Sequence, residues 1–132
     1  MTLEFINPPE LATPKGFSHA VVGSGRLVFL AGQTALDGSG RIIGGTVVEQ
    51  FDTALRNLLQ ALAAAGGRPS DLASLTLYIV DMADYQANSK PIGAVWRRLV
   101  GERYPAMAAV GVSRLWDEEA LVEVQGYAVL PS

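Results

Sequence analysis

The 132-residue sequence predicts an α/β fold in which two helices cover one face of a single mixed sheet. Apolar residues recur at helical spacing from Thr46 onward, and Gly66-Gly67 ends this first helical stretch. A second helix is predicted over 89–100. Short apolar runs precede, separate and follow the helices, an order typical of α/β domains. At this length the chain can bury one sizeable core, so residues 1–132 are predicted to form a single domain.

Six extended runs are predicted to supply the strands of this sheet. The first two are expected to form a hairpin, because Gly23-Ser24-Gly25 separates two apolar runs. A short run follows the next glycine-rich turn, one lies between the helices, and two end the chain. The six runs are 17–22, 26–31, 41–43, 72–80, 107–112 and 121–130.

The sheet is predicted to have a second apolar face that the helices cannot cover. Between the helices, Leu75, Leu77 and Ile79 alternate with Tyr78 and Val80, so both faces of this strand carry large apolar or aromatic groups. An apolar face of that size is unusual in a monomer. Self-association of the chain in a closed ring, sheet against sheet, is the simplest remedy.

Residues of the last strand also alternate between the two faces of the sheet. The helix-facing side is predicted to hold Val122, Val124, Ala128 and Leu130, and the other side Leu121, Glu123, Gln125 and Tyr127. The Glu123 carboxylate would then lie at or near a contact between subunits. Such a group is either paired in a salt bridge, exposed at an edge, or used for chemistry.

Composition and charge exclude several classes of function. The chain has no cysteine, which removes thiol catalysis and thiolate metal sites and fits a cytoplasmic protein. The net charge is −3 and the basic residues are scattered, so no nucleic-acid partner is predicted. No apolar run approaches the ~20 residues of a membrane span, and the first residues lack the features of a secretory signal, so no membrane partner is predicted.

Sequence motifs offer one further candidate for chemistry. The glycine runs at 23–25 and 38–40 complete neither a dinucleotide nor a phosphate-loop pattern, so no cofactor is predicted. His19 is the single histidine, which excludes a multi-histidine metal site. Histidine exchanges protons near neutral pH, so His19 is a candidate general base. The alternative is a packed or hydrogen-bonded structural histidine that shares a strand face with Phe17.

Several short segments together resemble the Rid family, also called the YjgF family. The segments are Gly16-Phe17-Ser18-His19-Ala20-Val21, Leu30-Ala31-Gly32-Gln33, Glu49-Gln50 with Asn57-Leu58, Tyr104-Pro105-Ala106, and Ala120-Leu121-Val122-Glu123-Val124. The resemblance spans about Pro8 to Leu130. It implies a chorismate-mutase-like α/β fold, a homotrimer, and small-molecule pockets in the clefts between subunits. Many members of this family are imine or enamine deaminases.

The resemblance also places the site, and most of its polar positions are changed in this chain. It implies Glu123 as a catalytic residue, beside which His19 stays a candidate from its own chemistry, and Phe17, Ala31, Gly32, Gly93, Met107 and Ala108 as substrate-binding residues. Met107 falls where deaminating members usually carry the arginine that holds the substrate carboxylate. Phe17 replaces a tyrosine and Ala31 a serine. Gly93 falls on an asparagine position, for which Asn88 is the competing candidate.

These substitutions predict a more apolar cleft, because methionine offers a soft apolar surface and no hydrogen-bond donor. The first hypothesis is a hydrolytic imine or enamine deaminase of altered specificity, in which Glu123 activates water. Typical 2-iminopropionate deaminase activity is then expected to be weak or absent. The second hypothesis is a binding protein of the same fold without turnover. A ribonuclease ranks last, because the chain is acidic and lacks the pair of histidines typical of RNA cleavage.

Overall fold

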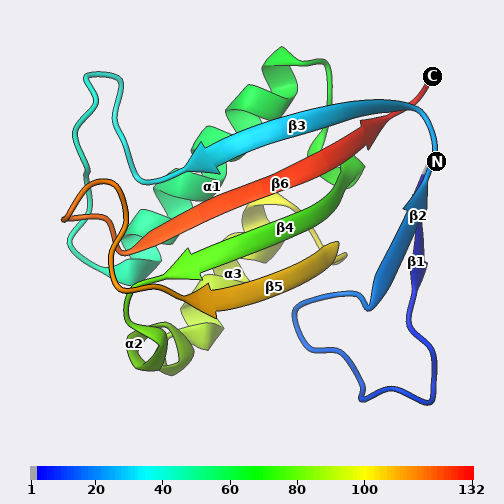
Figure 1. The fold of residues 1–132 in the computed structure, drawn as a ribbon, viewed down its shortest axis with the longest axis horizontal. Helices are drawn as coiled ribbons and strands as arrows, with labels where there is room; N and C mark the ends of the chain where they lie inside the picture. The colour runs from blue at the N-terminus through cyan, green and yellow to red at the C-terminus, as the bar shows by residue number, and fades with distance from the viewer. Residues whose placement is uncertain (1–2) are drawn as a thin grey trace.

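Four strands form the central sheet in the order β3-β6-β4-β5 (Figure 1). They are β3 (Arg26–Gln33), β6 (Val122–Leu130), β4 (Leu72–Ile79) and β5 (Ala106–Gly111). β4 and β5 run parallel and the other neighbours run antiparallel, so the sheet is mixed, as predicted. This computed structural model describes residues 3–132 of the chain.

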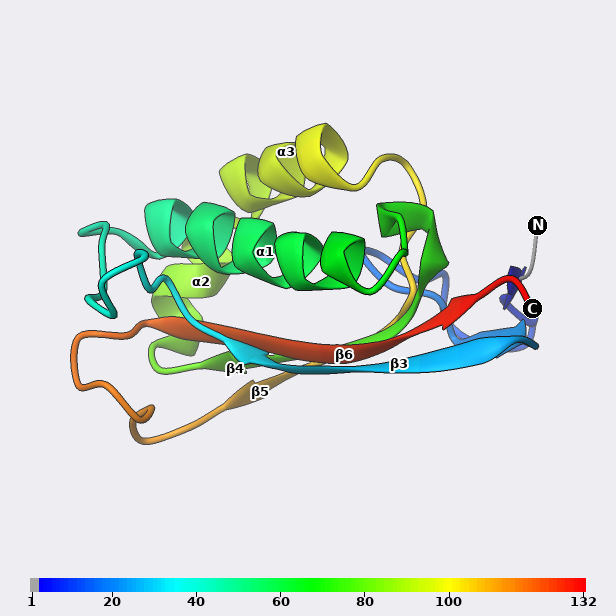
Figure 2. The ribbon, with the colours of Figure 1, turned by 90° about the horizontal axis from the view of Figure 1, so that it is seen from above.

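The two predicted helices lie on one side of this sheet (Figure 2). They are α1 (Val47–Ala64) and α3 (Ser89–Leu99). α1 begins with a capping box, in which the Thr46 hydroxyl accepts from the Glu49 amide and the Glu49 carboxylate accepts from the Thr46 amide, both at 3.1 Å. The apolar stripe of α1 packs on the sheet and forms the core with the inward side chains of β4 and β6; its fully buried members include Phe51, Leu55, Leu58, Leu62, Leu75, Ile79, Val122 and Val124.

The predicted hairpin at the start of the chain is wrong. β2 (Ala20–Gly23) pairs antiparallel with an N-terminal strand that the sequence did not predict, β1 (Leu3–Ile6), while β3 pairs with β6. The two apolar runs were recognised, but alternation specifies a strand and not its partner. At Gly25, where φ is 142°, the chain passes against the backbone of Leu130 and enters the central sheet beside the longer β6.

The predicted single sheet of six strands is also wrong in the part of the chain that the structure describes. β1 and β2 form a separate two-stranded sheet beside the four-stranded one. The predicted strand at 41–43 contributes only an isolated bridge between Leu36 and Ile42. A short helix that was not predicted, α2 (Met82–Ala87), connects β4 to α3 and is capped by the Asp81 side chain.

The face of the sheet away from the helices is uncovered (Figure 2). Its exposed large side chains include Leu27 at 65%, Phe29 at 73% and Tyr127 at 47% of their surface. The predicted sides of β6 are confirmed for its helix-facing residues Val122, Val124, Ala128 and Leu130, which are all buried. We call the uncovered surface the open face.

Leu121 does not belong to the open face, which contradicts its predicted side. It precedes β6, and its amide donates to the Gln50 side chain of α1 at 2.8 Å. This bond draws the chain toward the helices, and the Leu121 side chain packs against the core. No helix within residues 3–132 is both long and apolar enough to cross a membrane.

Candidate functional site

A cavity of about 870 Å³ lies where α3 faces the edge strand β5. Its third wall is the segment before β2, which is fastened to this edge at Ser18. The Ser18 amide donates to the Pro105 carbonyl at 2.9 Å, and the Ser18 hydroxyl donates to the Tyr104 carbonyl at 2.7 Å. These bonds hold Lys15 and Phe17 at the cavity. The volume lies in the range typical of small-molecule sites.

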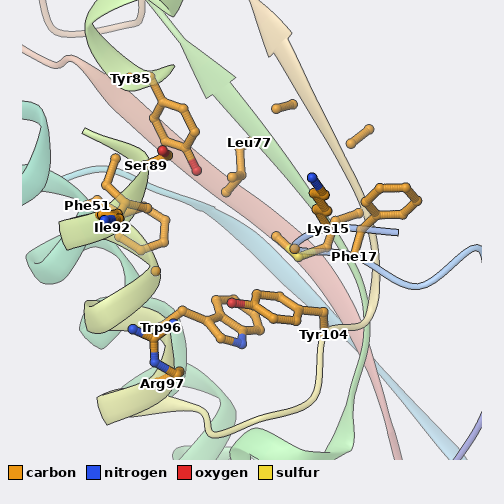
Figure 3. A pocket seen from close by; sticks show the side chains of 16 residues that line it. Lys15, Phe17, Phe51, Leu77, Tyr85, Ser89, Ile92, Trp96, Arg97 and Tyr104 are labelled. Carbon is orange, nitrogen blue, oxygen red and sulfur yellow. The ribbon is translucent and has the colours of Figure 1, made fainter. Parts of the chain in front are cut away.

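The inner wall of the cavity is aromatic and apolar (Figure 3). Trp96 is buried and stacks on Tyr104, with ring centroids 5.2 Å apart and an angle of 11° between the planes. The Trp96 indole nitrogen donates to the Arg103 carbonyl at 3.1 Å, which fixes the ring. Met107 of β5 pairs with Leu75 of β4, and Leu77 lies two residues further along β4 on the same face, so Met107 and Leu77 both line the cavity. Such a wall favours an apolar or aromatic ligand group.

The rim of the cavity carries three cations, Lys15, Lys90 and Arg97, and no acidic side chain lines it. This rim was not predicted, because the basic residues are scattered along the sequence. Helical spacing already separates Arg97 from Arg98, since adjacent helical residues point in different directions. Arg98 pairs with Asp52 of α1, whereas Arg97 lines the cavity.

Two hydroxyl groups stand in the same wall. Burial, with the nearby Tyr104, raises the pKa of Tyr85 to about 12, so its hydroxyl keeps its proton at any physiological pH. Ser89 lies beside it, in the first turn of α3 (Figure 3). Both groups line the cavity and are able to donate a hydrogen bond to a ligand.

Between the two competing asparagine positions, the structure places Gly93 at the cavity and Asn88 away from it. Gly93 lines the wall formed by α3. The Asn88 side chain donates to the carbonyl and the carboxylate of Asp84 within α2, at 2.8 and 3.1 Å. The wall therefore has no amide group at the position where the family resemblance expects one.

The other predicted residues form a second group on the open face, around the Glu123 carboxylate. β3 carries one extra residue between Leu30 and Gln33 relative to β6, a β-bulge at Ala31 and Gly32. A Cβ atom on Gly32 would lie only 2.2 Å from the Glu123 Oε2 atom. The carboxylate thus rests directly on the backbone at Gly32, where a bulge leaves backbone groups outside the regular ladder. We call Ala31, Gly32 and Glu123 the bulge group.

His19 belongs to neither group. Its Nε2 atom lies 2.8 Å from the Ala12 carbonyl, and its ring meets the Phe17 ring edge to face at 5.1 Å. The predicted strand face shared by Phe17 and His19 is wrong, because both residues precede β2 (Ala20–Gly23), although their rings touch. These contacts suit the structural alternative, in which His19 braces the segment that presents Phe17 to the cavity.

Apart from His19, the predicted residues fall into two places within one chain. Phe17, Gly93, Met107 and Ala108 line the cavity at β5, whereas the bulge group lies on β3 and β6. β4 separates β6 from β5 in the sheet, and Glu123 points to the open face while Met107 packs on the helix side.

Comparisons with known proteins agree with the fold. The sequence profile of the family described as Endoribonuclease L-PSP matches residues 8–130. The chain belongs to this family, which is also called the Rid or YjgF family. A RutC family protein from Pyrococcus horikoshii is 33% identical over 116 residues, 87% of this chain and 88% of that protein. The 2-iminobutanoate/2-iminopropanoate deaminase of Capra hircus is 31% identical over 114 residues, 86% of this chain and 79% of that enzyme.

Solved structures show the same architecture. The Rid family protein YyfB from Yersinia pestis superposes with a TM-score of 0.88 at 34% identity, over 98% of this chain and 100% of that one. A YjgF family member from Mycobacterium tuberculosis gives a TM-score of 0.65 at 26% identity, over 98% and 100% of the two chains.

Proposed function

We propose that the chain is a homotrimer in which the cavity beside Met107 of one subunit and the bulge group of a neighbour form one small-molecule site. Two observations support this assembly. The open face exposes Leu27, Phe29 and Tyr127, which a neighbouring sheet would remove from water. The bulge group lies beside these residues on β3 and β6, so the same contact would bring Glu123 to a subunit boundary.

The reaction we propose is hydrolysis of a carbon–nitrogen double bond. Water adds to the imine carbon, the nitrogen takes up protons, and the tetrahedral adduct breaks its carbon–nitrogen bond to give a ketone and ammonia. Glu123 accepts a proton from the attacking water and returns it to the departing nitrogen. The observation that carries this proposal is the Glu123 carboxylate resting against Gly32 at a bulge, in a chain whose other substrate-binding positions have lost their polar groups.

The relatives named 2-iminobutanoate/2-iminopropanoate deaminase support the reaction class. The substrate is expected to differ from theirs, because Met107, Phe17 and Ala31 offer neither a guanidinium nor a hydroxyl group. The second candidate function is binding of a small metabolite without turnover, which the apolar cavity favours as well. Ribonuclease activity ranks below both, since the net charge is −3 and the chain has a single histidine.

Replacing Glu123 by Gln should reduce the acceleration of imine hydrolysis to the spontaneous rate, because an amide cannot accept the proton from water. An L-amino-acid oxidase generates imines from a panel of small, branched and aromatic amino acids, and trapping by semicarbazide reports the imine that remains. The proposal requires that wild-type protein shortens the lifetime of at least one imine and that Glu123→Gln does not. If wild-type protein accelerates none of the panel, the binding function without turnover replaces the enzyme.

Replacing Gly32 by Ala should displace the Glu123 carboxylate, because the new Cβ would lie 2.2 Å from its Oε2 atom. The side chain can swing away, so folding should change little while turnover falls by roughly a hundredfold. Gly38→Ala is the matched control, since nothing lies within 4 Å of a Cβ there. Equal turnover in Gly32→Ala and Gly38→Ala would show that the position of the carboxylate is unimportant.

A further inference from the structure

We propose that the cavity beside Met107 binds a bulky apolar monocarboxylate, whose body lies on the aromatic wall and whose carboxylate is attracted to the positive rim that Lys15 and Arg97 form. This inference deepens the proposed function, on which it rests for its link to catalysis, by naming the ligand class of that site. In this arrangement, cations at the rim of the cavity take the role of the arginine that Met107 replaces.

The inner wall of the cavity provides an apolar surface for the body of the ligand. The cavity of about 870 Å³ is larger than a three-carbon imino acid needs. Trp96 is held by its hydrogen bond to the Arg103 carbonyl and by its stack on Tyr104, so this surface is formed before a ligand arrives. A preformed wall loses little conformational freedom on binding, which favours ligands with an aromatic or branched body.

The rim of the cavity provides positive charge for the carboxylate of the ligand. The ion pairs among residues 3–132 join Arg56 and Arg98 to Asp52, and neither Lys15 nor Arg97 takes part in one. No carboxylate lines the cavity to neutralise them. Figure 3 shows Arg97 beside Trp96 on α3 and Lys15 beside Phe17 on the other side of the cavity. An anion in the opening is therefore attracted from both sides, in a chain that is acidic overall.

The hydroxyl groups complete this environment for a carboxylate or an adjacent carbonyl. The Tyr85 hydroxyl points toward the cavity with Ser89 close by (Figure 3). Each adds a donor and neither adds negative charge at physiological pH. A neutral apolar ligand would leave the cations of the rim and these donors without a partner from the ligand.

The test uses 4-phenylbutyrate as the probe, with its neutral amide and butyrate as matched compounds. Isothermal titration of the full-length protein should give a Kd for 4-phenylbutyrate at least tenfold below that of either matched compound. Added salt should weaken only the two carboxylates. Equal Kd values for the acid and its amide would overturn the anionic half of the proposal, and equal values for 4-phenylbutyrate and butyrate would overturn the apolar half.

Variants locate the anchor. Lys15→Gln and Arg97→Gln should each weaken 4-phenylbutyrate binding about three- to tenfold, because both side chains are exposed and their charges are partly screened. Arg41→Gln, which removes one exposed charge from the loop between β3 and α1, should leave the Kd unchanged. An unchanged Kd in the Lys15→Gln Arg97→Gln double variant would overturn the assignment. Thermal melts of every variant confirm that the fold is retained.

The titration distinguishes this inference from the proposed function, because it needs no turnover. Binding of 4-phenylbutyrate through Lys15 and Arg97, with no imine hydrolysed, would uphold the ligand class and overturn the enzyme. Imine hydrolysis that depends on Glu123, without binding of the probe, would uphold the enzyme and overturn the ligand class.

Discussion

The protein should hydrolyse 2-iminopropanoate with a kcat/KM roughly a hundredfold or more below that of a relative that carries the binding arginine. The reason is Met107 at that position. A guanidinium fork donates two charge-assisted hydrogen bonds to a carboxylate, whereas a thioether donates none. Phe17 and Ala31 remove the supporting hydroxyl groups as well. The methyl group of this small imine gains little from the aromatic wall in return.

A coupled assay measures this difference. An amino-acid oxidase generates 2-iminopropanoate from alanine, and the release of ammonia is followed with wild-type protein, with Met107→Arg and with an arginine-bearing deaminase at equal concentration. Met107→Arg should regain part of the activity but not all of it, because the hydroxyl groups remain absent. Wild-type activity equal to that of the arginine-bearing enzyme would show that another group fully replaces the arginine even for this small substrate.

Among other anchors, Arg114 is already engaged in its own loop. Its guanidinium donates to the carbonyls of Leu115 and Trp116 at 3.1 and 3.2 Å. The cations of the cavity rim, Lys15 and Arg97, and the backbone at Gly32 are then the groups to change next. In the same assay, Lys15→Gln and Arg97→Gln would lower the activity if the rim cations are the source, and would leave it unchanged if the backbone at Gly32 is.

The two long helices, α1 and α3, and the two faces of the sheet were predictable because short-range rules determine them. The Thr46 capping box and Gly66-Gly67 bound the first helix within the sequence itself. Side chains of a strand alternate between the two faces of a sheet, so the sequence of the last strand places Val122 and Val124 on the buried face and Glu123 on the other. Only Leu121 departs, because its amide donates a hydrogen bond to the Gln50 side chain, 71 residues away in sequence.

Strand partners and the composition of the cavity were not predictable, because both depend on contacts between distant segments. No local feature of the sequence specifies that β2 pairs with β1 and that β3 pairs with β6. The family resemblance predicted Phe17, Gly93 and Met107 as substrate-binding residues, and all three line the cavity. Lys15 and Arg97 match no motif of the family, so the resemblance did not predict them. Lys15 lines the cavity because Ser18 fastens the segment before β2 to the edge of the sheet at β5. Arg97 lines it because α3 directs this one of its two adjacent arginines toward the cavity.

Replacing Phe29 by Asp should abolish assembly and yield a folded monomer. Phe29 exposes 73% of its surface on the open face and meets Tyr127 edge to face at 5.6 Å. Burying such a side chain against a neighbour stabilises the assembly by about 1.5–3 kcal/mol per copy. A carboxylate in its place loses that contribution and must also give up its hydration, which costs several kcal/mol more without a partner. The single chain should stay folded, because Phe29 makes no part of the core beneath the helices.

Light scattering at micromolar concentration, with circular dichroism to confirm the fold, measures the outcome. Wild-type protein should have the mass of three 14.0 kDa chains and Phe29→Asp the mass of one. Gln60→Asp, on the exposed side of α1, adds the same charge away from the open face and should remain a trimer. A trimeric Phe29→Asp would exclude the open face from the contact, and a monomeric wild type would refute the assembly itself. Because the bulge group lies on the same two strands as Phe29 and Tyr127, a monomeric variant should also lose whatever turnover depends on Glu123.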